Sequence, residues 1–203
     1  MAGFIKICGL GDAAAVDAAL QGGADALGFV FAPSVRRVTP AQATALAAPA
    51  RGRVPCIAVM LHPTQADCDA VLQGFAPDVL QTDSSDFDTL RLPTQLQRLP
   101  VVRAAAGTPV PGGRILFEGP RSGTGQLADW DQARQLAAQQ PVILAGGLAP
   151  DNVAAAIAAV QPFGVDVSSG VEAAPGRKDP ARIAQFIAAA RAAFAPRAQE
   201  RRA

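Results

Sequence analysis

Short apolar runs alternate with alanine-rich helical stretches along the chain, and this alternation limits the possible folds more than any other feature. The apolar runs predict eight strands. They lie at residues 4–8, 26–31, 56–61, 78–82, 101–104, 114–117, 142–145 and 163–167. The stretches between them predict helices at 12–21, 40–47, 64–73, 87–97, 129–139, 150–159 and 179–194.

Eight strand–helix units in 203 residues are typical of a (β/α)8 barrel at the small end of its size range. The rival fold is an open doubly wound sheet, whose first turn usually reads GxGxxG; here "CGLGDA" lacks the third glycine. Residues 105–113 are rich in Gly and Pro, so we expect a loop in place of the helix between the fifth and sixth strands. No linker divides the chain, which we expect to be one domain over 1–203 with a frayed tail from about residue 195.

Two of the predicted helices begin with capping residues. Asp12 can accept hydrogen bonds from the first-turn amides of the helix that follows it. Thr39 precedes Pro40, which places an N-cap before a proline at the first helical position.

The composition excludes several classes of function. A net charge of +1 gives no strong attraction to nucleic acid or to an anionic membrane. Three scattered cysteines, Cys8, Cys56 and Cys68, form no CxxC pair, and His62 is the only histidine, so neither a disulfide framework nor a zinc site is expected. The sequence shows no signal peptide and no apolar run near the roughly 18–20 residues of a membrane span, so we expect a cytoplasmic protein.

Active sites of such barrels lie where the strands end, and the first strand ends on Cys8. Because side chains alternate along a strand, Phe4, Lys6 and Cys8 share one face, and Ile5 and Ile7 share the other. A thiol and an amine therefore point the same way. The alternative is that Cys8 is a small buried hydrophobe.

Other strand ends carry polar or small residues. Glu118 ends the sixth strand. It is either an acid/base group or an exposed loop glutamate. Small residues follow the seventh and eighth strands, at Gly146–Gly147 and Ser168–Gly170. These segments either form tight turns only or present backbone amides that bind phosphate. Two arginines, Arg36 and Arg37, follow the second strand. They are either solvated side chains, or one of them binds a carboxylate through two hydrogen bonds.

Several of these segments together resemble one enzyme family. "KICGL", "GADALGFVFAPSVRRVTP", "SGTG" followed by "DW", "LAGGLAPDNV" and "VDVSSGVEAAPGRKD" are similar to phosphoribosylanthranilate isomerase of tryptophan biosynthesis. The similarity runs from Ile5 to about Phe186. The first-strand and last-strand motifs are specific to that family, whereas paired glycines occur in many phosphate-binding barrels.

The resemblance implies a (β/α)8 barrel without a cofactor, active on a small phosphorylated substrate as a monomer or homodimer. The family converts N-(5-phosphoribosyl)anthranilate to the 1-deoxyribulose 5-phosphate derivative by an Amadori rearrangement. By the resemblance of the motifs, the family's general base falls on Cys8 and its general acid on Glu118. Its substrate-binding residues fall on Arg36 and Asp166. Its phosphate-binding residues fall on Gly146, Gly147, Ser169 and Gly170.

The chain departs from the family in three places. The general acid is usually an aspartate, but this position holds Glu118, which is one methylene longer. The family's "QLHG" appears as "QTDS", which keeps Gln81 and loses the histidine, and Arg37 replaces a tyrosine-like residue. Glu118 is the one feature that favours a catalytically silent or differently specific phosphate-binding barrel, and the other two departures indicate a diverged branch with altered contacts at the rim. The histidine-pathway isomerase fits less well, because its two-aspartate pattern is missing where strand one ends in Cys8.

A cysteine base must lose its proton, and a free thiol is mostly protonated at neutral pH. Lys6, about 7 Å from Cys8 by strand geometry, is a candidate cation to raise the thiolate share. The same lysine could instead fill the barrel or pair with an acid.

Overall fold

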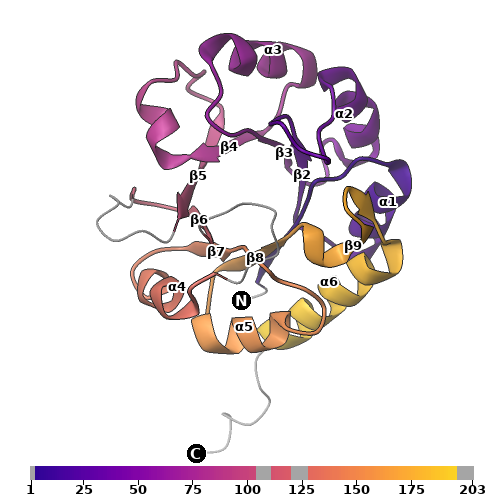
Figure 1. Cartoon of the computed structure of the whole chain (residues 1–203), viewed down its shortest axis with the longest axis vertical. Coiled ribbons are helices and arrows are strands. Elements are labelled where there is room, and N and C mark those ends of the chain that lie inside the picture. The colour runs from indigo at the N-terminus through magenta and orange to yellow at the C-terminus, as the bar shows by residue number, and fades with distance from the viewer. Residues whose placement is uncertain (1–2, 104–110, 120–127, 196–203) are drawn as a thin grey trace, which may run out of the picture.

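Eight parallel strands close into a barrel in the computed structural model, which describes residues 3–103, 111–119 and 128–195 (Figure 1). Each strand pairs with the next in the chain, and β8 pairs with β1 to close the ring. The strands are β1 (Phe4–Cys8), β2 (Ala26–Val30), β3 (Cys56–Val59), β4 (Val79–Asp83), β5 (Gln97–Arg103), β6 (Ile115–Glu118), β7 (Val142–Leu144) and β8 (Gly164–Val167). The expected (β/α)8 barrel is confirmed.

Helices surround the ring of strands on its outer side (Figure 1). They are α1 (Ala13–Gly22), α2 (Pro40–Ala47), α3 (Gln65–Phe75), α4 (Trp130–Ala137), α5 (Val153–Val160) and α6 (Pro180–Phe194). The capping residues act as the sequence predicts. Asp12 accepts a hydrogen bond from the Ala15 amide, and Thr39 forms a reciprocal capping box with Gln42 in front of Pro40.

One predicted helix is wrong. Residues 87–97 contain only the end of the 3-10 helix η2 (Ser84–Asp88) and the first residue of β5, and no α-helix. Pro93 disfavours helical geometry at the residue before it and supplies no amide donor, so this stretch stays irregular. The connection between β5 and β6 shows no helix over residues 111–114, as expected, and its other residues lie outside the described ranges.

After β8 the chain forms elements that the sequence analysis did not predict. A 3-10 helix, η3 (Ser169–Val171), leads into an antiparallel hairpin of β9 (Glu172–Ala174) and β10 (Arg177–Lys178). Pro175 and Gly176 make its turn, with Gly176 at a φ of 79°. This hairpin bears directly on the site described below.

The core has two layers. The inner one fills the barrel and contains Ala26, Ile57, Val79, Leu99, Val101, Leu116, Ile143 and Ala145. The outer one packs the strands against the helices and includes Ile5 and Ile7, whereas Phe4 packs against the inner layer. The predicted division of the first strand into two faces is therefore confirmed.

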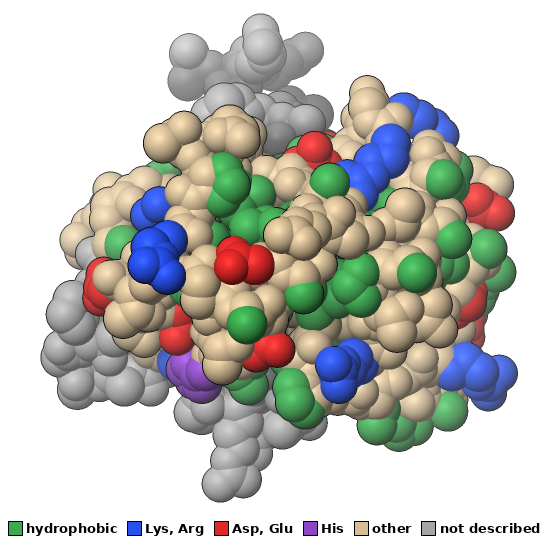
Figure 2. Space-filling model, turned by 90° about the horizontal axis from the view of Figure 1, so that it is seen from above, with side chains coloured by type: hydrophobic (Ala, Val, Ile, Leu, Met, Phe, Trp, Pro, Cys, Tyr) green, Lys and Arg blue, Asp and Glu red, His purple; other side chains and the backbone are tan. Residues whose placement is uncertain are grey.

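The surface mixes charges of both signs. Figure 2 shows acidic and basic side chains interspersed with hydrophobic ones on one side of the barrel. No helix in the described ranges combines the length and the apolar character that crossing a membrane requires. The tail expected to fray lies outside the described residues from 196 onward.

Candidate active site

A cavity of about 180 Å³ opens at the end of the barrel where the strands finish. Residues at or near the C-terminal ends of seven strands contribute to its wall, together with the loops after β2 and β3. Its lining is Cys8, Val30, Ala32, Pro33, Ser34, Arg36, Val59, Met60, Leu61, Gln81, Val101, Arg103, Glu118, Asp166 and Ser168. Four predicted site residues, from separate parts of the chain, therefore meet in one cavity: Cys8, Arg36, Glu118 and Asp166.

Cys8 lies beside a buried ion pair. Lys6 is fully buried inside the barrel, and its Nζ donates to Asp166 Oδ1 at 2.7 Å. Gly28, on the adjacent strand, leaves room for both groups on β1. A Cβ atom at that position would lie 3.0 Å from Cys8 Sγ and 3.1 Å from Lys6 Nζ, so any larger residue would press on both groups.

The electrostatic surroundings of Cys8 favour the thiol form. Burial raises the pKa of the Cys8 thiol above its ordinary value, and the charge of Asp166 acts in the same direction. The ammonium groups of Lys6 and Lys178 lower this pKa but do not offset burial. Lys6 thus lowers the pKa of Cys8, in the expected sense, and it also pairs with an acid, Asp166, but burial keeps the net shift of the Cys8 pKa upward.

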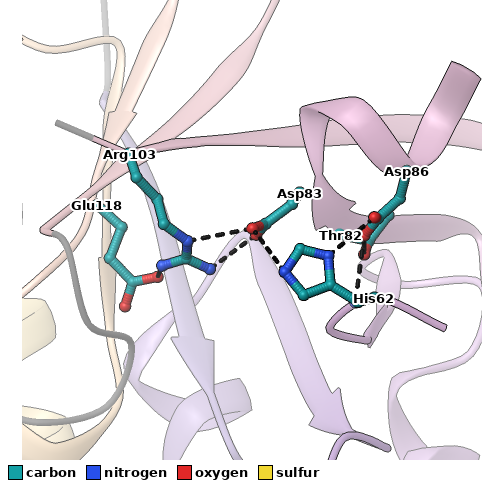
Figure 3. A network of polar contacts seen from close by, with 6 residues as sticks. All are labelled: His62, Thr82, Asp83, Asp86, Arg103 and Glu118. Atoms are coloured by element: carbon teal, nitrogen blue, oxygen red, sulfur yellow. Dashed lines mark hydrogen bonds and ion pairs between the residues drawn. The ribbon is translucent and has the colours of Figure 1, made fainter. Parts of the chain in front are cut away.

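Glu118 is held at the rim of the cavity by Arg103, as Figure 3 shows. Arg103 donates to Glu118 Oε2 at 3.1 Å and to the two oxygens of Asp83 at 2.7 and 3.2 Å. Burial lowers the pKa of Arg103, but hydrogen bonds and charge from Asp83 and Glu118 outweigh it and raise the pKa overall. His62 extends the network from the loop after β3, with Nε2 3.5 Å from Asp83 and Nδ1 2.9 Å from Asp86 (Figure 3).

Arg36 and Arg37 have different surroundings. The Arg36 side chain is 11% exposed and lines the cavity, and its Nε and Nη2 donate to Glu172 at 2.6 and 2.9 Å. Within the described ranges, Arg36 Nη1 has no hydrogen-bond partner, so a guanidinium edge remains for a ligand carboxylate. Arg37 is exposed and lines a separate hollow of about 390 Å³ on the outer side of the β2 and β3 loops.

The predicted phosphate residues lie together in two touching turns. Gly146 and Gly147 follow β7 at φ of 91° and 66°, and neither amide donates to another part of the described chain. A Cβ atom on Gly170 would lie 1.9 Å from the Leu148 carbonyl oxygen, so only glycine permits the contact between the turns. Ser169 and Gly170 begin η3, where backbone amides have no helical acceptor. These turns lie beside the cavity, next to Ser168, and do not line it.

Several polar residues of the site have no role assigned from sequence, among them Arg103, which holds Glu118. Gln81 lines the cavity, and its buried Oε1 has no hydrogen-bond partner within the described ranges, so it can accept from a ligand hydroxyl. Glu172 and Lys178 lie within a quoted motif, but only the hairpin brings them to Arg36 and Ser168. The turn residues Pro175–Gly176 were the available sign of that hairpin. No group of three or more His, Cys, Asp or Glu side chains in the described ranges is placed to hold a metal ion.

Comparison with known proteins decides the family. A sequence model of N-(5'-phosphoribosyl)anthranilate (PRA) isomerase matches residues 5–189. The chain belongs to this family. A PRA isomerase from Nitrobacter hamburgensis is 39% identical over 212 residues, covering 94% of this chain and 93% of that protein.

Solved structures agree with this family and with the barrel. TrpF from Jonesia denitrificans is 35% identical, with a TM-score of 0.80 over 97% of this chain and 100% of that one. A PRA isomerase in complex with reduced 1-(o-carboxyphenylamino)-1-deoxyribulose 5-phosphate is 27% identical, with a TM-score of 0.77 over 93% of this chain and 98% of that one. The resemblance inferred from the motifs is therefore confirmed.

Proposed function

We propose that this chain isomerises N-(5-phosphoribosyl)anthranilate to 1-(2-carboxyphenylamino)-1-deoxyribulose 5-phosphate in tryptophan biosynthesis, with Cys8 as general base and Glu118 as general acid. Membership of the PRA isomerase family supports the reaction. The residue roles rest on one observation: the Cys8 thiol of β1 and the Glu118 carboxylate of β6 line the same cavity as Arg36.

The reaction needs an acid first. Protonation of the ribose ring oxygen by the carboxylic acid of Glu118 lets the anilino nitrogen push open the ring, giving an iminium at C1. Glu118 lies at the cavity rim, where its side chain is 14% exposed and Arg103 fixes its orientation. Asp83 shares the same guanidinium through two hydrogen bonds, so the charge of Arg103 is divided between two carboxylates.

The reaction then needs a base. The Cys8 thiolate removes the proton from C2 of the open-chain iminium, which gives an enolamine. Protonation of the enolamine at C1 and loss of the O2 proton complete the ketone. Lys6 and Lys178 favour the thiolate, and Asp166 neutralises Lys6 inside the barrel.

The substrate has a charged group at each end, and the site offers a partner for each. The remaining edge of Arg36 fits the anthranilate carboxylate, since a guanidinium binds a planar carboxylate through paired donors. The amides of Gly146, Gly147, Ser169 and Gly170 fit the phosphate. Asp166 and Gln81 line the cavity between these ends, where the ribose hydroxyls would lie.

Complementation tests this function. Expression of the chain should restore growth without tryptophan to a strain that lacks this isomerase, and a Cys8→Ala variant should not. The alternative of a silent phosphate-binding barrel predicts no growth from either, with inorganic phosphate still bound by the purified protein. Growth supported equally by wild type and Cys8→Ala would contradict the role of Cys8.

A further inference from the structure

Glu172 has every acceptor position of its carboxylate filled by the protein. Oε1 accepts from Arg36 Nε at 2.6 Å and from Lys178 Nζ at 2.9 Å. Oε2 accepts from Arg36 Nη2 at 2.9 Å and from the Gly176 amide at 3.2 Å. A carboxylate has about four such positions, so Glu172 has none left for substrate or for proton transfer.

Lys178 is saturated in the same way. Its side chain is fully buried, and its ammonium group has three N–H donors. Three acceptors surround it: Glu172 Oε1 at 2.9 Å, the Ser168 carbonyl at 2.9 Å and Ser168 Oγ at 3.2 Å. Lys178 is therefore tied at once to the carboxylate that holds Arg36 and to the residue that precedes Ser169 and Gly170.

The charges of this group also balance in a way that suits an anionic ligand. Burial raises the pKa of Glu172, but the hydrogen bonds and charges of Arg36 and Lys178 outweigh it and lower the pKa to about 2. Glu172 is thus a fixed anion between two cations. Burial lowers the pKa of Lys178, against the hydrogen bond and charge of Glu172, and with Lys178 protonated the three side chains carry a net charge of +1 next to the cavity. One positive charge remains to attract the substrate.

The backbone around the group leaves little space for it to move. A Cβ atom on Gly9 would lie 2.8 Å from Arg36 Cδ and 3.0 Å from Ser168 Oγ, so the turn after β1 packs against both. A Cβ atom on Gly176 would lie 2.7 Å from the Val35 carbonyl oxygen, so the hairpin turn packs against the loop that carries Arg36. The β9–β10 hairpin joins the loop after β2 to the turn after β8.

We propose that Lys178 is a positioning residue that, through Glu172 and Ser168, fixes the carboxylate-binding Arg36 and the phosphate-binding turn at Ser169–Gly170 relative to each other. This inference rests on the proposed function, since it takes Arg36 and that turn as the two ends of the substrate site. It assigns to Lys178 and Glu172 no contact with substrate. Their effect is on how well both ends of one molecule are bound together.

Two half-substrate probes separate this role from a general loss of structure. Anthranilate tests the Arg36 end, and inorganic phosphate tests the turn. Lys178→Met should weaken binding of both probes and raise KM for the full substrate by roughly tenfold or more. Because the Lys178 ammonium also lowers the pKa of the Cys8 thiol, kcat should fall as well, so the two probe-binding constants, which do not depend on Cys8, test the positioning role. Glu172→Gln should weaken anthranilate binding and leave phosphate binding near the wild-type value, because Lys178 still contacts Ser168.

The matched control is Arg177→Met, which removes an exposed cation from the adjacent position of the same short strand and should change none of these quantities. If Lys178→Met does not fold, as judged by circular dichroism, Lys178→Gln serves in its place. Weakening of only one probe by the Lys178 variant, or an unchanged KM, would overturn the inference. Absence of isomerase activity in the wild type would instead refute the proposed function, and the two binding measurements would still decide the role of Lys178.

Discussion

At the scale of single residues, alternation along a strand predicted more than composition did. Phe4, Lys6 and Cys8 were expected on one face, and all three face the barrel interior or its mouth. The partner of Lys6 could not be predicted, because Asp166 lies 160 residues away and meets it only when β8 closes onto β1. The direction of the pKa shift of Cys8 could not be predicted either, because it depends on burial as well as on neighbouring charges.

The Cys8 thiol should therefore titrate at a higher pH than free cysteine. Burial disfavours the thiolate and raises its pKa, so the thiolate fraction is small at neutral pH and grows only in alkaline solution. A Cys56→Ala, Cys68→Ala protein leaves Cys8 as the only thiol, and its ultraviolet thiolate absorbance reports the midpoint. We expect a midpoint above the roughly 8.5 of free cysteine. A midpoint at or below that value would show that Lys6 and Lys178 dominate over burial.

At the scale of elements, strands and most helices were predictable because their periodicity is local. The 87–97 helix failed because Pro93 lies in the middle of the stretch, where it supplies no amide donor and disfavours helical geometry at the residue before it. The β9–β10 hairpin was missed because its strands have only three and two residues. Short strands carry little pattern, although the Pro175–Gly176 turn between them is visible in the sequence.

The two turns after β7 and β8 should bind phosphate as one unit. Gly147 has a φ of 66°, so Gly147→Val places a β-branched side chain in an unfavourable conformation and displaces the amides. KM should rise by about tenfold or more, and inhibition by inorganic phosphate should weaken in parallel. Gly52→Val is the matched control, because Gly52 has a φ of 72° and precedes β3 at the opposite end of the barrel. An unchanged KM for Gly147→Val would count against this phosphate site.

At the scale of the whole molecule, the order of strands around the barrel is the order of the chain, which is why eight local predictions were enough to give the fold. The same closure brings strand ends that are distant in sequence to one mouth, so Cys8, Arg36, Glu118 and Asp166 could be predicted to lie in one cavity. Their mutual contacts could not. The Arg103–Glu118 pair depends on the register of β5 and β6, which sets the two residues side by side, and the Arg36–Glu172 pair depends on the β9–β10 hairpin; sequence spacing encodes neither.

The kcat of Glu118→Gln tests the central claim most directly, because it bears on the position where this chain departs from its family. Glutamine keeps the shape of the side chain and can still meet Arg103, but it cannot donate the proton that opens the ring. With Cys8 as base and Glu118 as acid, kcat should fall roughly 10²-fold or more, while KM stays within a few-fold of wild type. Cys8→Ala should lower kcat at least as much. A near-normal kcat for Glu118→Gln beside an inactive Cys8→Ala would contradict the assignment and point to Asp83 or Asp166 as the acid.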